Sequence, residues 1–377
     1  MVDDQMPQNK KKRILLVGDS NEDFDLKFYE WLKSMMSKEF IVKNWYIHSN
    51  SSKNSFFLIK WYTAIKKLKR LLKKFNPNKI MICGDSLATT WIIVFIVKLF
   101  RLKIEISLFR YDMTHFRLWP KSFREKYGHF VSLHLEKFCL LNADKIIHTS
   151  IERELELLPF YKKIQNKPHH LFREYINPKL VQKYNSNIKL SKKDREPHLV
   201  YVGTFPTKDL PNVDSIWNFI PKITSQSIHF HLYSKASENI IVKYKSIEKK
   251  DLYFHYEGYI KHDKLTKELT KYDYGLRLHV WNRTGGKIDN YLKTQIGNKD
   301  FDYISASLPI ICHKNAEAVA ELVRKNGIGI CINSEEALNL KKILMKNGKK
   351  MPTFIKNIDI FIKSNLDSKK LIDFIKN

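Results

Sequence analysis

The stretch "GNKDFDYISASLPIICHKN", residues 297–315, gathers side chains that can do chemistry at the start of a predicted helix. Lys299, Asp302 and Tyr303 share this short helix, and Pro309 separates it from an apolar strand. The first N–H groups of a helix carry a partial positive charge, so they suit an anion such as a diphosphate. Lys299 adds a full charge, and Asp302 can accept hydrogen bonds from hydroxyl groups. The alternative is that Asp302 is a solvated helix residue and Lys299 one more surface lysine.

The elements that must position this helix alternate between strands and helices over residues 198–352. Apolar strands such as "HLVYVGTF" and "PIICH" are separated by helices predicted over 212–223, 262–271 and 298–306. This alternation predicts a parallel, doubly wound sheet.

Residues 1–175 show the same alternation, from "KRILLVGDS" to "DKIIHTS", and form the predicted N-terminal domain. The polar residues 176–197, which are interrupted by prolines, are expected to be a linker. Helices over 353–377 are expected to pack back on the N-terminal domain. The predicted fold class is therefore α/β, with two doubly wound Rossmann-like domains facing a cleft where ligands bind.

Length and composition fit this organisation. A chain of 377 residues is long for a single core, and 43% hydrophobic content with 13% aromatics excludes wholesale disorder. The net charge of +28 would attract nucleic acid, an anionic membrane or phosphorylated small molecules, without choosing among them. The four cysteines form no CxxC pair, which argues against a disulfide scaffold or structural zinc site and favours a reducing cytosol.

No segment predicts membrane insertion or export. The apolar run near the N-terminus is only "ILLV", and the run at 87–97 is shorter than the ~20 residues that a membrane-spanning helix needs. We expect a cytoplasmic protein that is soluble, or at most peripheral on the cytoplasmic membrane face.

Several stretches, by their order along the chain, resemble the GT-B glycosyltransferases, in particular the group that contains retaining enzymes of polysaccharide and glycolipid synthesis. "LVYVGTF" at 199–205 is similar to the first strand and glycine turn of their nucleotide-binding domain. "LYFHYEGYIKHDKLTKELTKYDYGLRLH" resembles the segment beside the base pocket, and "KDFDYISASLPII" the donor-site helix with its following strand. "LEKFCLLNADKIIHTS" looks like the end of the acceptor domain.

The resemblance implies a transferase that moves a sugar, of the hexosyltransferase type, from a nucleotide-diphosphate sugar to a hydroxyl acceptor. In this interpretation Lys299 contacts the phosphates and Asp302 the ribose. Arg277 either points to the diphosphate or pairs with an acidic neighbour, and Tyr259 either meets the base or packs in the core. The full predicted set of donor-binding residues is Gly203, Thr204, Lys208, Tyr259, Arg277, Lys299, Asp302 and Tyr303.

Two positions depart from the family pattern. The glutamate that contacts the donor sugar, eight residues before the ribose carboxylate, is replaced by Thr294. The glycine before Pro309 is replaced by the pair Ser307 and Leu308. The phosphate and ribose contacts therefore have more support than the sugar contact.

The acceptor-side candidates follow two strands of the first domain. "GDSNEDFD" places Gly18 and Asp19 after the first strand, and "RYDMTHFR" places Asp112 and His115 after the fourth. Asp112 and His115 are the predicted catalytic residues, which orient the acceptor or take its proton as a general base. A retaining enzyme would depend more on the donor phosphate, and the sequence leaves both outcomes open.

No cofactor and no essential metal are predicted, since the histidines show no zinc spacing such as HExxH. The amphipathic, lysine-rich helix at 56–75 either packs on the core or contacts an anionic membrane, as a lipid-linked acceptor would favour. The acceptor is expected to be a surface-glycan or lipid-linked saccharide precursor. The alternatives are a nucleotide-sugar epimerase or polyol-phosphate transferase on the same fold, a GT-B protein without activity, and a basic nucleic-acid-binding protein. No specific nucleic acid is predicted, because recognition motifs are missing.

Overall fold

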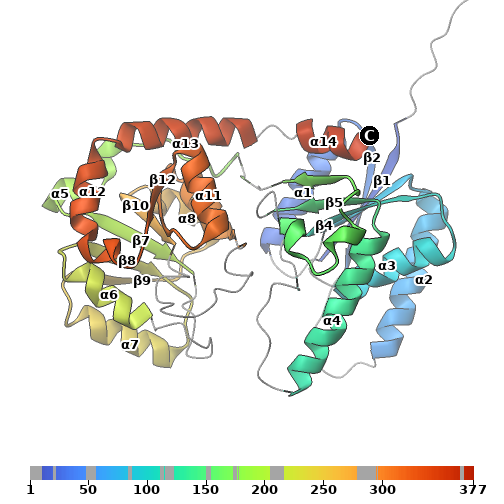
Figure 1. Cartoon of the computed structure of the whole chain (residues 1–377), viewed down its shortest axis with the longest axis horizontal. Coiled ribbons are helices and arrows are strands. Elements are labelled where there is room, and N and C mark those ends of the chain that lie inside the picture. The colour runs from blue at the N-terminus through green and yellow to red at the C-terminus, as the bar shows by residue number, and fades with distance from the viewer. Residues whose placement is uncertain are drawn as a thin grey trace, which may run out of the picture. The chain divides into compact units, whose positions relative to one another are not determined.

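Two six-stranded parallel sheets organise the chain, and each belongs to its own unit of the computed structural model (Figure 1). One unit comprises Met1–Arg173 with Ser368–Asn377, and the other comprises Glu174–Asp367. The structure describes all residues except 1–10, 20–22, 48–56, 84–86, 111–113, 115–122, 150–153, 173–175, 177, 204–215, 278–293, 295 and 366–368.

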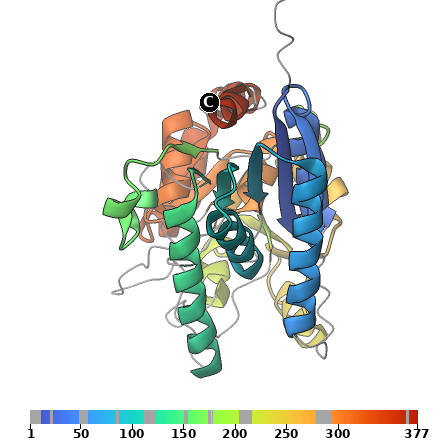
Figure 2. The ribbon, with the colours of Figure 1, turned by 90° about the vertical axis from the view of Figure 1, so that its right-hand side faces the viewer.

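The sheet of the N-terminal unit has the strand order β2-β1-β3-β4-β5-β6. Its elements alternate as predicted up to β5: β1 (Arg13–Asp19), α1 (Asp23–Met36), β2 (Ile41–Ile47), α2 (Phe57–Phe75), β3 (Lys79–Cys83), α3 (Leu87–Leu99), β4 (Glu105–Arg110), α4 (Phe123–Asn142) and β5 (Lys145–His148). The edge strand β6 (His169–Leu171) was not predicted. The inner strands β1, β3, β4 and β5 are largely apolar and buried because helices cover the sheet, whereas the edge strands β2 and β6 are more exposed. Figure 2 shows α2 in blue and α4 in green as the long helices of this unit. Among the described residues, no helix is both long and apolar enough to cross a membrane.

The chain returns to this unit at its end, where α14 (Lys369–Lys376) packs against it. The Lys145 ammonium donates to the Ile375 carbonyl at 3.3 Å, and Lys376 pairs with Glu39 at 2.7 Å. The preceding helix, α13 (Met351–Asn365), belongs to the C-terminal unit. The two last helices are thus divided between the units.

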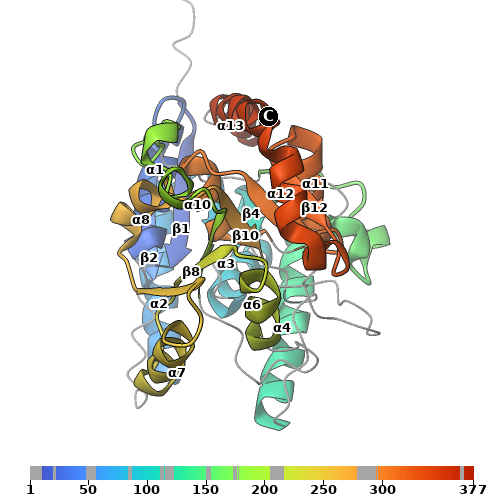
Figure 3. The ribbon, with the colours of Figure 1, turned by 90° about the vertical axis from the view of Figure 1, so that its left-hand side faces the viewer.

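The sheet of the C-terminal unit has the order β12-β11-β10-β7-β8-β9. Figure 3 labels β12, β10 and β8 of this sheet. Its strands are β7 (His198–Val202), β8 (His229–Tyr233), β9 (Phe254–Gly258), β10 (Tyr274–Arg277), β11 (Ile310–His313) and β12 (Gly329–Ile332). Counted from β7, this is the 3-2-1-4-5-6 order of dinucleotide-binding folds. The strand order reverses between β7 and β10, and such a switch point is where ligands bind.

Two hydrophobic clusters fix the helices on this sheet. One is built around α6 (Ile216–Thr224), α7 (Glu238–Glu248) and α12 (Leu340–Gly348), and the other around α8 (His262–Leu269), α10 (Asn298–Ser305) and α11 (Glu317–Asn326).

The segment 176–197 is built into the C-terminal unit and does not run free as a linker would. The buried Lys189 ammonium donates to the Tyr272 carbonyl, and the Gln182 N–H donates to the Ser305 carbonyl at 2.7 Å. Its polar composition resembles a linker, but its polar groups find partners in the turn before β10 and at the end of α10.

Candidate functional site

The candidate site lies at the switch point of the C-terminal sheet. Gly203 directly follows β7, Arg277 ends β10, and α10 begins at Asn298 after Gly297. Gly203 has a φ of +125°, a conformation that side chains resist, so the turn after β7 requires glycine. The backbone of one strand, a side chain of the next and a helix N-terminus therefore converge at one end of the sheet.

Lys299 points from the first turn of α10 back over this switch point. Its Nζ lies 4.7 Å from the centre of the Tyr201 ring and 3.2 Å from the Tyr201 hydroxyl. A Cβ built on Gly203 would stand only 3.1 Å from the same Nζ, so the glycine also makes room for the ammonium. Burial, reinforced by the nearby Arg277, lowers the pKa of Lys299 to about 7. A half-buried cation of this kind is stabilised by a bound anion.

Arg277 and Asp300 form a buried ion pair beside Lys299. The Arg277 Nε is 3.4 Å from the Asp300 carboxylate, and the two side chains are 3% and 0% exposed. The same carboxylate accepts the Gly297 N–H at 2.8 Å, which fixes the start of α10. Two cations thus share one fully buried carboxylate, and the helix N-terminus adds further positive potential. The arrangement suits a ligand with more than one negative charge.

Asp302 lies one turn along α10 and is held by a different partner. Its Oδ1 is 2.9 Å from Nε2 of His262, the first residue of α8. The carboxylate remains 12% exposed, and this contact fixes its orientation. A carboxylate oriented in this way, close to a phosphate site, can accept hydrogen bonds from sugar hydroxyls.

The surroundings of two predicted donor contacts, Tyr303 and Tyr259, differ, and only Tyr303 needs a different interpretation. Tyr303 is fully buried; its hydroxyl accepts the Val202 N–H at 3.0 Å and donates to the Leu276 carbonyl at 3.3 Å. It therefore positions the strands around the switch point and cannot touch a ligand directly. Tyr259 is 65% exposed, which excludes the alternative that it packs in the core.

Other predicted residues lie outside the described part of the chain. These are the donor-side Thr204 and Lys208 and the catalytic candidates Asp112 and His115. Gly18 is buried near the end of β1, and Asp19 ends that strand, with a side chain that is not described.

The structure describes both positions that depart from the family pattern. Thr294 is 4% exposed. Ser307 has a φ of +53°, the left-handed conformation that glycine favours just after a helix, and its hydroxyl donates to the Gln182 carbonyl at 2.7 Å. Ser307 thus adopts the backbone shape of the expected glycine, and its side chain ties α10 to segment 176–197.

Sequence reasoning missed Tyr201, His262 and the capping role of Asp300. Tyr201 faces Lys299 only through the sheet, and no local pattern marks such a contact. The signal for Asp300 was available, since an acidic residue three positions after a helix start is typical of a cap.

Two parallel Rossmann-like sheets, with an anion-suited switch point in the second, define an α/β protein of the GT-B type, as the sequence predicted. Residues 199–373 match the family described as "Glucosyltransferase 3-like, C-terminal domain". The match spans the whole switch point. Fold and family match together support a glycosyltransferase. No curated protein matches the chain in sequence.

Solved structures with the same fold cover nearly the whole chain. A protein from Listeria monocytogenes described as a UDP-N-acetylglucosamine 2-epimerase has a TM-score of 0.58 at 10% identity, over 92% of this chain and 91% of its own. An alpha-glucosyltransferase, solved with UDP-glucose and DNA containing an abasic site, has a TM-score of 0.57 at 14% identity, over 97% and 99%. UGT2 of Phytolacca americana, complexed with UDP-2fluoro-glucose and pterostilbene, has a TM-score of 0.51 at 10% identity, over 92% and 94%. At these identities the likeness establishes the fold alone.

Proposed function

We propose that the protein transfers a hexosyl group from a nucleotide-diphosphate sugar to a hydroxyl acceptor. The observation that carries this proposal is the half-buried ammonium of Lys299, whose pKa burial lowers, beside Arg277 and the N-terminus of α10. The three together offer a diphosphate two cations and the partial positive charge of a helix N-terminus. Asp302, oriented by His262, would receive the ribose hydroxyls.

The transfer breaks the bond between the anomeric carbon and the phosphate oxygen, and the electron pair leaves with the nucleoside diphosphate. The acceptor oxygen forms the new bond to the same carbon and loses its proton. Lys299 and Arg277 would stabilise the charge that grows on the leaving diphosphate, and this stabilisation is greatest in the transition state. This division of work assigns charge neutralisation to side chains and calls for no metal in the transfer step.

The proton acceptor depends on the stereochemical outcome. In an inverting reaction, Asp112 or His115 would take the acceptor proton, with Gly18 and Asp19 lining the acceptor side. In a retaining reaction, the leaving phosphate would take it.

We also propose that the acceptor is a surface-glycan or lipid-linked precursor met at the cytoplasmic membrane face. Leu99, Phe100 and Leu102 are 58%, 54% and 36% exposed at the end of α3. The Lys69 ammonium of α2 lies 5.1 Å from the centre of the Phe100 ring, and lysines such as Lys66 and Lys67 are exposed along α2. Exposed apolar side chains among lysines suit an anionic bilayer surface. Co-sedimentation with anionic vesicles, but not with neutral ones, would support this placement; equal behaviour with both would remove it.

The donor is tested first by thermal shift of the full chain against UDP, GDP, CDP, ADP and their sugars. A ligand of the native state raises the melting temperature by mass action, and we expect one base to dominate. No rise at millimolar ligand would contradict the donor site.

The second candidate, a nucleotide-sugar epimerase, is kept because the fold is shared with a protein described as a UDP-N-acetylglucosamine 2-epimerase. Product analysis separates the two. A transferase releases nucleoside diphosphate in step with a glycosylated acceptor, whereas an epimerase changes the sugar nucleotide without an acceptor.

A further inference from the structure

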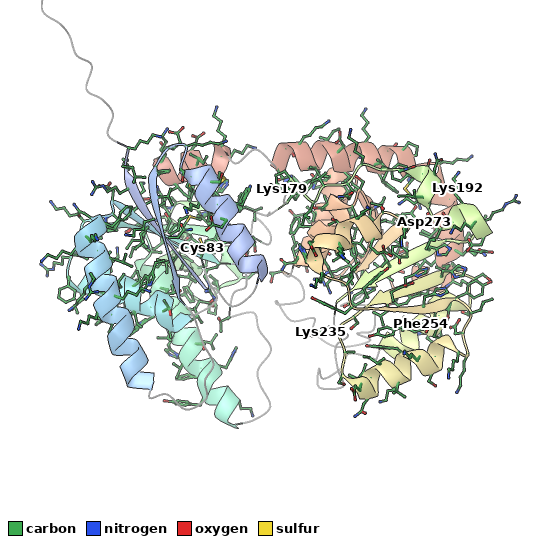
Figure 4. The ribbon with its side chains drawn as sticks, turned by 180° about the vertical axis from the view of Figure 1, so that it is seen from behind. Cys83, Lys179, Lys192, Lys235, Phe254 and Asp273 are labelled. Carbon is green, nitrogen blue, oxygen red and sulfur yellow. The ribbon has the colours of Figure 1, made fainter. Side chains whose placement is uncertain are left out.

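A cluster of histidines lies at the opposite end of the C-terminal sheet from Lys299. His198 begins β7, His229 begins β8, and the two are direct partners in the parallel ladder. Asp194 ends the short helix α5 (Ser191–Asp194) just before β7. In Figure 4, Lys192 of α5 and Asp273 lie at this end of the unit, and Lys235, beyond β8, lies at the other. The cluster is therefore separate from the switch point.

The geometry directs three potential ligand atoms at one another. Oδ2 of Asp194 is 2.9 Å from Nε2 of His198 and 3.4 Å from Nε2 of His229. Its other oxygen, Oδ1, accepts the Glu196 N–H at 2.9 Å, which leaves Oδ2 to face the imidazoles. One ligand atom from each of these three residues can be chosen such that all lie within 4.8 Å of one another.

The other ring nitrogen of each imidazole, Nδ1, is also held by a hydrogen bond. Nδ1 of His198 is 2.9 Å from Nε2 of His231, whose Nδ1 is 2.7 Å from the Glu257 carboxylate. Nδ1 of His229 is 2.8 Å from Nε2 of His255. Histidines that bind metals characteristically have the other ring nitrogen held by a hydrogen bond in this way.

The hydrogen-bond pattern leaves one contact of the cluster without a proton when its imidazoles are neutral. The chain Glu257–His231–His198–Asp194 contains three close contacts, at 2.7, 2.9 and 2.9 Å, and each needs a proton or a cation between its two acceptors. Two neutral imidazoles supply only two protons. If these occupy the first two contacts, the bare Nε2 of His198 faces a carboxylate oxygen. A single proton could fill that gap, but the second imidazole directed at the same oxygen favours a larger cation.

We propose that Asp194, His198 and His229 bind a divalent transition-metal ion of the zinc class. Two imidazole nitrogens and one carboxylate oxygen suit such an ion better than calcium or magnesium, which prefer oxygen ligands. Bonds of about 2.0–2.1 Å in a tetrahedron separate neighbouring ligand atoms by roughly 3.3 Å, close to the 2.9 and 3.4 Å between Asp194 Oδ2 and the two Nε2 atoms. The two imidazoles are stacked, with ring centres 4.3 Å apart and planes 8° apart, so a ring would turn to direct both nitrogens at the ion. The fourth position is left for water.

The role that follows is structural. The ion would tie α5, and with it segment 176–197, to the first two strands of the sheet. The Asp273 carboxylate already joins the same parts, since it accepts from the Ser191 hydroxyl at 2.7 Å and from the His198 N–H at 2.8 Å. The site takes no part in the transfer step, so it is independent of the proposed function. The expectation that catalysis needs no metal stays a separate prediction.

The test uses the full chain with any affinity tag removed, treated with EDTA and then dialysed against Zn²⁺. We expect one equivalent of bound zinc, a rise in melting temperature with Zn²⁺ but not with Mg²⁺, and binding at least tenfold weaker in Asp194→Asn and His229→Gln. His169→Gln is the matched control, since His169 is an exposed histidine of the other unit, and it should bind as the parent does.

Absence of stoichiometric zinc, or equal binding by the parent and both variants, would overturn the proposal and leave a proton as the occupant. Should the variants not fold, Co²⁺ binding to the parent decides. The strong visible absorption of tetrahedral Co²⁺ with nitrogen and oxygen ligands is expected, and its absence would also overturn the site.

Discussion

The ammonium of Lys299 lies on the ring of Tyr201, 4.7 Å from its centre and 3.2 Å from its hydroxyl, although the two residues are 98 positions apart. A cation over an aromatic face is stabilised by ~0.5–2 kcal/mol, less than water would provide. The contact therefore holds the charge in place without neutralising it. This incomplete compensation makes the switch point ready for an anion.

Replacing Lys299 by methionine tests this directly. Lys299→Met keeps the length of the side chain but removes a charged hydrogen bond worth about 1.5–3 kcal/mol, so diphosphate affinity should fall roughly 10- to 100-fold. The free energy of unfolding should not decrease, because burying the ammonium is costly. Calorimetric titration with the nucleoside diphosphate found by thermal shift measures the affinity. Denaturant unfolding measures the free energy of unfolding. Lys346→Met, an exposed lysine of α12, should behave as the parent; equal affinities for both variants would refute the phosphate role.

Donor binding should take up a proton above neutral pH. Desolvation, aided by Arg277 and opposed by Asp300 and Asp302, lowers the pKa of Lys299 from 10.5 to about 7, and Tyr201 is the other group that faces it. Above pH 7 the free protein therefore loses the ammonium that the diphosphate needs. Affinity should fall by up to tenfold per pH unit.

The stability of the free protein should move in the opposite direction. The unfolded chain keeps this lysine protonated up to about pH 10.5, so between about pH 7 and 10.5 it binds more protons than the folded chain. The contribution of Lys299 to stability therefore rises with pH over this window.

Proton uptake on donor binding can be measured directly. Titration of a nucleotide sugar at pH 8, in two buffers of different ionisation heat, counts the protons that the protein takes up when it binds the donor. Uptake in the parent but not in Lys299→Met is expected, and zero uptake in the parent would contradict the lowered pKa.

Asp302 should contribute to recognition of the ribose rather than of the phosphates. Asp302→Asn keeps the shape near His262 but weakens acceptance from hydroxyl groups, so affinity for the nucleoside diphosphate should drop about tenfold, as for a charged hydrogen bond. Inorganic pyrophosphate should bind equally to parent and variant. A 2′-deoxy analogue separates the two hydroxyls, because it should be affected less by the substitution if Asp302 contacts the 2′ position. Equal losses for pyrophosphate and nucleotide would place Asp302 in the phosphate site instead.

The sequence predicted what depends on local pattern. Apolar runs alternating with amphipathic segments gave both parallel sheets, and Lys299 was placed correctly at the first turn of α10. Contacts that depend on strand order could not be predicted from the sequence. The Lys299–Tyr201 contact exists because β10 lies beside β7, with β8 and β9 on the other side, and no residue spacing encodes that order. Pairing of Arg277 with an acidic neighbour was one of the two predicted alternatives, but the sequence did not name Asp300 as the partner.

Sequence reasoning missed the histidine cluster for the same reason, although a partial signal was present. His229 and His231 alternate in β8, and His255 and Glu257 alternate in β9, so each pair shares a face. His198 joins them only through the ladder that pairs it with His229. A search for zinc spacing along the chain cannot find histidines and carboxylates that three elements bring together in space.

Tyr303 should act on stability first and on donor binding as a consequence. Tyr303→Phe leaves the ring packed on Gly275, where a Cβ would stand 2.4 Å from the ring, but removes the acceptor of the Val202 N–H. A buried donor without a partner costs about 1–3 kcal/mol, so the free energy of unfolding should fall by that amount in denaturant titration. Because Val202 precedes Gly203, a looser strand end should also weaken diphosphate binding. Tyr259→Phe, at a tyrosine that is 65% exposed, is the matched control and should leave stability within about 0.5 kcal/mol of the parent. If both variants unfold alike, the Tyr303 hydroxyl does not hold the switch point, and the preorganisation of the phosphate site must come from the Asp300 cap alone.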